Sequence, residues 1–127
     1  MTTPTKDIDE SAPRLSGKTE LVEWFEAGAK PKTDWRIGTE HEKFGFTWDG
    51  LRPLPYDGEA SIKTMLEGLR DKFDWSPIEE NGYLIGLKKN GASVSLEPGG
   101  QFELSGAPLE HIHQTCNEVG QHLNAVR

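Results

Sequence analysis

The sequence predicts an α+β fold in which helices flank an antiparallel sheet, and three observations support this class. Asn81-Gly82 and Asn90-Gly91 separate short β-prone runs, and Asn-Gly between such runs is the strongest local signal for a β-hairpin. Residues 58–72 carry apolar side chains at helical spacing on one face. Residues 108–126 repeat apolar positions at steps of three and four, which predicts a further helix at the end of the chain.

The first 50 residues predict a leader, a helix and a strand, in that order. Residues 1–14 are polar and show no apolar period, so we expect a flexible leader there. From Ser16 the apolar residues recur at helical spacing, and Lys30-Pro31 should end that helix. Residues 35–46 are rich in aromatic and β-branched side chains, which predicts a strand that ends at a turn in Asp49-Gly50.

Turn signals separate the remaining elements. The helix predicted at 58–72 presents one apolar face, made of Ile62, Met65, Leu66, Leu69 and Phe73. Turn dipeptides then divide four short runs, at 75–80, 83–89, 93–97 and 101–104, which predict an antiparallel meander. Pro108 should open the last helix, because proline is favoured in the first turn.

The last helix has a predicted apolar seam through Leu109, Ile112, Cys116, Val119, Leu123 and Val126. The seam continues to the end of the chain without a capping glycine. We therefore expect the sequence to be truncated there.

Length and charge narrow the function classes. A chain of 127 residues fits one domain. Its net charge is −7 and its basic residues are scattered, so nucleic acid and anionic membranes are poor candidate partners. No window approaches the roughly 18 apolar residues that a membrane span needs. Because the N-terminus also lacks the features of a targeting segment, a cytoplasmic location is the simplest expectation.

Glu40 and Glu42 stand two residues apart in the strand predicted at 35–46. Because side chains alternate between the faces of a strand, both carboxylates should lie on one face, about 7 Å apart along the backbone. Like charges at that spacing repel each other or attract a cation. The alternative is that this face lies in water, which screens the pair and leaves it without a function.

Glu97 and Glu103 flank a Pro-Gly-Gly break at 98–100. A hairpin or bulge there would bring both to the same end of the sheet, with Gln101 and Glu103 on one strand face. Glycines at such a bend let a ligand or metal approach the backbone, although an ordinary tight turn with surface carboxylates is the alternative. Together the four glutamates form an all-oxygen set, which hard cations such as Mg²⁺ prefer.

Other residues give weaker indications of chemistry. His41 should point to the strand face opposite the acidic pair, and His111 and His113 should diverge on a helix, so a zinc site is not expected. Cys116 is the only cysteine, which excludes an intrachain disulfide, and its place on the apolar seam favours a buried structural thiol. Neither a phosphate-binding loop nor a dinucleotide fingerprint is present.

Three long motifs resemble a known enzyme family. The runs IGTEHEKFGF (37–46), IGLKKNGASVSLEPGGQFELSGAPL (85–109) and HQTCNEV (113–119) resemble glutamate-cysteine ligases of the plant and proteobacterial type. The resemblance covers residues 15–127, all but the leader. It implies that this region is the N-terminal part of a longer catalytic domain.

The resemblance implies a reaction and a set of ligands. Members of the family join the γ-carboxylate of glutamate to the amine of cysteine, using ATP and Mg²⁺ through a γ-glutamyl phosphate, in the first step of glutathione biosynthesis. Their catalytic domain resembles that of glutamine synthetase. By position, the glutamates expected to hold Mg²⁺ at the ATP phosphates are Glu40, Glu42, Glu97 and Glu103.

Four neighbouring residues receive lesser roles from the same resemblance. Gln101 and Arg36 would support the site, whereas His41 and Lys43, on the other strand face, would be structural. The implied partners are L-glutamate, L-cysteine, ATP and the remainder of the catalytic domain. Without that remainder the chain should be inactive, because an incomplete site neither orients the phosphates nor excludes water.

Two other functions fit the same motifs. One is a related carboxylate-amine ligase that acts on another amine or acid, such as the glutamate-cysteine ligases of ergothioneine pathways. The other is a non-catalytic domain that binds Mg²⁺ or a partner subunit. The SLEPGGQFELSGAP run favours the glutathione-type enzyme over the first, and the apolar seam with nothing after it to close its end favours a larger protein over the second.

Overall fold

A computed structural model of the chain describes residues 14–127, so the leader predicted at 1–14 lies, apart from Arg14, outside the described residues. The chain divides into two compact units, 1–35 and 36–127, and each is described by itself. The first contains the helix α1, Lys18–Ala27, and a short 3-10 turn, η1, Lys32–Asp34. The helix predicted from Ser16 is confirmed, and the Ser16 hydroxyl donates a hydrogen bond to Glu20 at 2.7 Å.

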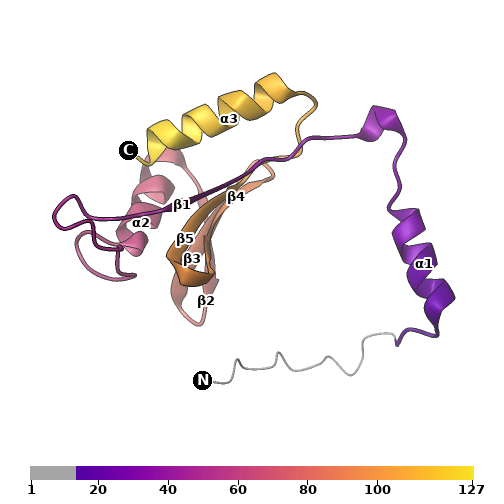
Figure 1. Ribbon diagram of the computed structural model, residues 1–127, viewed down its shortest axis with the longest axis horizontal. Helices are drawn as coiled ribbons and strands as arrows, with labels where there is room; N and C mark the ends of the chain where they lie inside the picture. The colour runs from indigo at the N-terminus through magenta and orange to yellow at the C-terminus, as the bar shows by residue number, and fades with distance from the viewer. Residues whose placement is uncertain (1–13) are drawn as a thin grey trace. The chain divides into compact units, whose positions relative to one another are not determined.

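The second unit is built on one five-stranded antiparallel sheet, which confirms the predicted fold class (Figure 1). Its strands are β1, Glu40–Phe44; β2, Ser76–Glu80; β3, Tyr83–Lys89; β4, Ala92–Glu97; and β5, Gln101–Ser105. The strand order is β1-β5-β4-β3-β2, so the four predicted meander strands are present in sequence order. β1 comes from far earlier in the chain and pairs with β5 at the edge.

The two Asn-Gly pairs form the hairpin turns that the sequence predicts. Asn81 and Gly82 have φ values of 51° and 80°, and Asn90 and Gly91 have values of 51° and 85°. Two consecutive positive φ angles match the right-handed twist of the flanking strands, as in type I′ turns. Asparagine tolerates this region better than most residues, and glycine adopts it without steric cost. The turns therefore fix the pairing of β2, β3 and β4.

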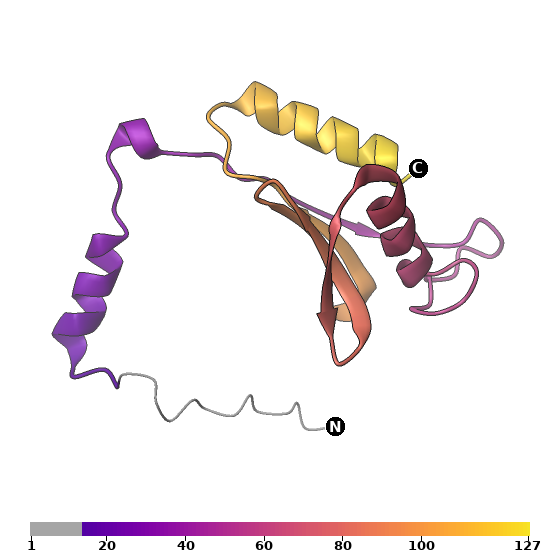
Figure 2. The same cartoon turned by 180° about the vertical axis from the view of Figure 1, so that it is seen from behind.

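Two helices cover one face of the sheet and enclose the core (Figure 1). They are α2, Ile62–Phe73, and α3, Ile112–Ala125, and the end of α3 lies against α2 (Figure 2). Ser61 caps α2 by accepting a hydrogen bond from the Thr64 amide at 3.2 Å. The buried core side chains are Ile62, Leu66, Leu69, Leu84, Leu87, Val94, Phe102 and Leu104.

The last helix begins later than the sequence predicts. Its first turn starts at Ile112, after His111, and not at Pro108. The backbone of Leu109 instead exchanges two hydrogen bonds with Ile37, at 2.7 and 2.9 Å, in an isolated bridge that continues the pairing of β1 with β5. Since those backbone groups are already bonded across the sheet, they are not free to open a helix.

The predicted apolar seam of this helix is confirmed in part, since Val119 and Val126 pack against the core. Thr115 and His122 are the buried residues of α3, whereas Cys116 is exposed and Ile112 is 56% exposed. The helix therefore packs through Thr115 and His122 in addition to Val119, while the first turns of the predicted seam face outward. Cys116 is an accessible thiol and not the buried structural residue that the seam implied.

No helix in the described part of the chain is long and apolar enough to cross a membrane.

The core makes a direct prediction about stability. Leu66 is fully buried, so Leu66→Ala should lower the free energy of unfolding by about 2–5 kcal/mol, through lost burial and a residual cavity. Leu51→Ala removes the same atoms from a residue that is 66% exposed. It should change the free energy of unfolding by less than about 0.5 kcal/mol. Urea denaturation followed by circular dichroism measures both, and equal losses would contradict the assigned core.

Candidate functional site

The predicted glutamates lie on the face of the sheet that α2 and α3 leave uncovered. Residues directly opposite each other in an antiparallel pair share a face. Glu42 of β1 pairs with Glu103 of β5, and Glu103 also pairs with Ser95 of β4. Phe102 and Leu104, on either side of Glu103, are buried beneath the helices. Because side chains alternate along a strand, Glu103 and its partners point to the opposite face.

Glu103 is the centre of an acidic cluster on this uncovered face. Its direct partner, Glu42, stands about 4.5–5.5 Å away between Cβ atoms. Glu40 and Glu97 are its diagonal neighbours on β1 and β4, at about 7–8 Å. We call the surface formed by Glu40, Glu42, Glu97 and Glu103 the acidic face. Pairing thus gathers carboxylates from three strands.

Neutral side chains on the same surface hydrogen-bond to these carboxylates. The bonds run from Ser105 Oγ to Glu103 at 2.7 Å, from Ser95 Oγ to Glu97 at 3.1 Å, and from Gln101 Nε2 to Glu42. Each donor occupies one acceptor site and leaves further lone pairs on the carboxylate. The supporting position predicted for Gln101 therefore has a physical basis, since it orients Glu42.

The acidic face has the ligand chemistry for a hard cation. Mg²⁺ prefers oxygen ligands and is usually held by one or two carboxylates together with waters and substrate phosphates. The opposed pair Glu42 and Glu103 fits that mode. Within residues 14–127, however, no three acidic, histidine or cysteine side chains converge on a point that could hold a metal ion. The face therefore supplies part of a coordination shell, and its assignment as a metal site stays a prediction.

His41 and Lys43 lie on the helix-covered face, as their alternation with the acidic pair predicts. Lys43 Nζ donates a hydrogen bond to the backbone oxygen of His41 at 2.8 Å and lies 6.0 Å from the centroid of the Phe102 ring. Burial lowers the pKa of Lys43, and the negative charge of Glu103 opposes that effect. Their contacts are thus with the core side of the sheet.

His122 is a buried polar residue that the sequence did not predict. Only 6% of it is exposed, and its ring stacks on Phe102 with centroids 6.2 Å apart. Burial is the largest cause that lowers the pKa of His122, and together with the nearby Lys43 and His41 it brings that pKa to about 4. His122 lies seven residues after Thr115, so the two share one helix face, and this spacing could have indicated it. Because both residues are polar, the apolar pattern of the sequence did not select that face.

The remaining predicted residues lie around the start of α3. Arg36 is 3.8 Å from Glu110 in an exposed ion pair, and its supporting role stays a prediction. The expectation that His111 and His113 diverge on a helix is wrong: His111 is the N-cap of α3, and the two rings pack edge to face with centroids 6.1 Å apart. The exposed ion pair between Arg36 and Glu110 should contribute little to stability.

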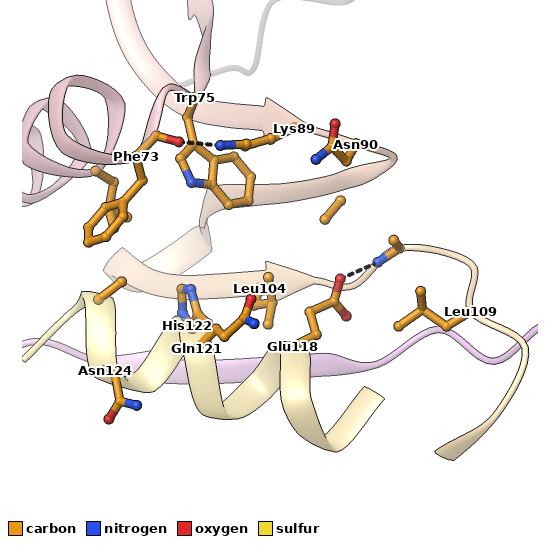
Figure 3. Close-up of a pocket in the computed structure, with 14 residues that line it drawn as sticks. Phe73, Trp75, Lys89, Asn90, Leu104, Leu109, Glu118, Gln121, His122 and Asn124 are labelled. Carbon is orange, nitrogen blue, oxygen red and sulfur yellow. Dashed lines mark hydrogen bonds between the residues drawn. The ribbon is translucent and has the colours of Figure 1, made fainter. Parts of the chain in front are cut away.

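A groove of about 610 Å³ opens on the helix-covered side of the sheet (Figure 3). Phe73, Trp75 and Leu104 contribute apolar walls, and Glu118 and His122 of α3 also line it. None of the four predicted glutamates lines this groove. The acidic face and the groove are therefore separate features on opposite sides of one sheet.

The depressed pKa of His122 predicts a pH dependence of stability. The folded protein keeps His122 neutral down to about pH 4, whereas an unfolded histidine binds a proton near pH 6.5. Between these values the unfolded state binds more protons, so the free energy of unfolding should fall as pH is lowered, by at most about 1.4 kcal/mol per unit.

Urea unfolding between pH 7 and pH 4 tests this dependence. His122→Phe keeps the ring stacked on Phe102 without a titrating group and should flatten the slope. His113→Gln, at an exposed position on the same helix, is the matched control and should keep it. Parallel pH profiles for the wild type and His122→Phe would show that His122 is not responsible.

Comparison with known proteins identifies close relatives. The chain is 54% identical over 124 residues to glutamate–cysteine ligase A, chloroplastic, of Oryza sativa subsp. japonica, covering 98% of this chain and 24% of the relative. It is 52% identical over 124 residues to the chloroplastic enzyme of Solanum lycopersicum, covering 98% and 23%. It is 51% identical over 110 residues to that of Arabidopsis thaliana, covering 87% and 20%.

These names correct the predicted location. All three relatives are described as chloroplastic, which contradicts the expectation of a cytoplasmic protein. That expectation depended on the absence of targeting features at the N-terminus, whereas the folded region carries no physical signal for a compartment.

The extent of the matches defines what the chain represents. It spans about a quarter of the length of the curated relatives it matches. The family model described as glutamate-cysteine ligase family 2 matches residues 36–127, the whole of the sheet-containing unit. The chain therefore belongs to glutamate-cysteine ligase family 2.

Proposed function

We propose that this chain forms part of an enzyme that joins the γ-carboxylate of L-glutamate to the amine of L-cysteine with ATP, the first step of glutathione biosynthesis. The family match and the relatives' names support the two amino acid substrates. The sheet would be one part of a larger catalytic domain resembling that of glutamine synthetase. The names of the relatives also favour a plastid location.

The observation that carries this proposal is the clustering of Glu40, Glu42 and Glu97 around Glu103 on the uncovered face. ATP phosphates and the glutamate carboxylate are all anionic, and bringing them together against a surface of carboxylates requires cations. When bound, Mg²⁺ would neutralise that charge and align the phosphoryl group for in-line transfer.

The residues of the acidic face then have distinct tasks. Glu42 and Glu103, directly opposite each other, would hold one cation between β1 and β5. Gln101 and Ser105 keep these carboxylates oriented through the hydrogen bonds that they donate. Phosphorylation of the substrate carboxylate would give a γ-glutamyl phosphate, from which the cysteine amine displaces phosphate. No side chain of the acidic face needs to form a covalent bond.

Charge-removing variants of a full-length ligase that carries this segment test the metal assignment. Glu42→Gln and Glu103→Gln should each raise the Mg²⁺ concentration for half-maximal activity at least about tenfold, because a neutral amide binds a hard cation poorly. Glu80→Gln, an exposed glutamate at the end of β2, should leave it unchanged. Activity close to wild type at limiting Mg²⁺ in both variants would count against the proposal.

The chain by itself should form no γ-glutamylcysteine. An open sheet face cannot exclude water or orient both substrates, and electrostatic preorganisation supplies most of the rate enhancement in many enzymes. A product assay with ATP, glutamate, cysteine and Mg²⁺ measures this directly, with a full-length relative as the positive control. Sustained turnover by the isolated chain would show that residues 1–127 contain a complete active site.

A further inference from the structure

Glu118 of α3 reaches back to the connection that follows β5. Its Oε1 atom accepts a hydrogen bond from the Ala107 amide at 2.9 Å, the bond drawn beside Glu118 in Figure 3. Its Oε2 atom is buried and has no hydrogen-bond partner among the described residues. A buried acceptor without a partner is unfavourable, so its retention calls for a physical reason.

The unpartnered oxygen lies directly against Gly106. A Cβ atom on Gly106 would collide with Glu118 Oε2 and would stand only 3.1 and 3.2 Å from the backbone oxygen and nitrogen of Thr39. Contacts below 3.4 Å are tighter than most real Cβ atoms show, and two of these atoms belong to backbone that cannot swing away. A larger residue at position 106 therefore requires the Glu118 side chain to move and the Thr39 backbone to give by a few tenths of an ångström.

The contact between Gly106 and Thr39 extends the pairing of β5 with β1, the two strands that carry Glu103, Glu40 and Glu42. The Gly106 amide donates a hydrogen bond to the Thr39 oxygen at 2.6 Å, one step beyond the pairing of Glu40 with Ser105. Among residues 14–127, β1 is an edge strand whose one neighbour in the sheet is β5, so its register is set from that side. Glu118 therefore lies against Gly106, the residue that bonds to Thr39 where β1 enters the sheet.

We infer that Glu118 is a positioning residue for the acidic face: together with Gly106 it fixes the register of β1 against β5 and so the spacing of Glu40 and Glu42 from Glu103. This rests on the proposed function, because the spacing matters to a cation shared between the strands. Glu118 acts through Gly106 and Thr39 and touches neither substrate nor cation. A residue behind a ligand shell commonly affects metal affinity about 10–100-fold.

The test measures the Mg²⁺ concentration for half-maximal activity in a full-length ligase that carries this segment. Gly106→Ala should raise it about tenfold, because the added methyl pushes Thr39 and Glu118 apart. Adding Glu118→Ala to that variant makes room for the methyl group and should recover part of the loss. Glu118→Gln keeps an acceptor for the Ala107 amide and should stay within about twofold of wild type.

The design separates positioning from a general loss of stability. Gly120→Ala on α3 is the matched control, because a Cβ there meets nothing within 4 Å, and it should leave the Mg²⁺ requirement unchanged. A purely structural role would lower the melting temperature of Gly106→Ala without changing its Mg²⁺ requirement, and that result would overturn the inference. Effects of Gly106→Ala and Glu118→Ala that simply multiply would also overturn it, because residues in contact should be coupled.

Three further outcomes decide between failure of the variant to fold, failure of the proposed function and failure of the inference alone. If Gly106→Ala does not fold, Glu118→Ala alone decides: a wild-type Mg²⁺ requirement in that variant rejects the positioning role. If Glu42→Gln and Glu103→Gln also leave the requirement unchanged, the proposed function fails and the inference fails with it. If Glu42→Gln and Glu103→Gln raise the Mg²⁺ requirement while Gly106→Ala leaves it unchanged, only the role of Glu118 is rejected.

Discussion

The pairing of β1 with β5 is the constraint on which the candidate site depends. It brings Gln101 into hydrogen-bonding contact with Glu42, which is 59 residues away in the sequence. Closing so long a loop costs conformational entropy before any contact is made. Phe102 and Leu104 of β5 are buried against the helices on the other face of the sheet. The free energy gained by burying these apolar side chains compensates for the entropy cost of closing the loop. The acidic face is therefore held in place by the hydrophobic core behind it.

The alternation of side chains along three strands divides the sheet into two unlike faces. On β5, Phe102 and Leu104 enter the core while Gln101, Glu103 and Ser105 face outward. The outward set includes carboxylates close enough to repel one another, which destabilises the strand pairing in the absence of a counter-charge. Hydrogen bonds from serine and glutamine offset part of that repulsion. An arrangement that costs stability and gathers oxygen ligands is typical of a functional surface.

Much of the fold could be predicted because its signals are local. The Asn-Gly pairs fix two hairpins through their backbone geometry, and the apolar face of α2 follows from helical spacing. The packing face of α3 could be predicted only in part, because Val119 packs against the core as expected but Thr115 and His122 are buried where a simple apolar pattern favours Cys116. The start of α3 depends on the long-range bridge of Leu109 to Ile37, which no local pattern encodes. Alternation placed Glu40 with Glu42 and Glu103 with Gln101, but the common face of all four glutamates and the central position of Glu103 required the register between strands.

Anomalous diffraction from crystals of a full-length ligase carrying this segment, grown with Mn²⁺ in place of Mg²⁺ and a non-hydrolysable ATP analogue, tests the central claim most directly. A manganese ion should bridge the analogue's phosphates and the acidic face, with a carboxylate oxygen of Glu42 or Glu103 in its coordination shell. Manganese bound to the phosphates by other residues alone, with all four glutamates outside the coordination shell, would contradict it.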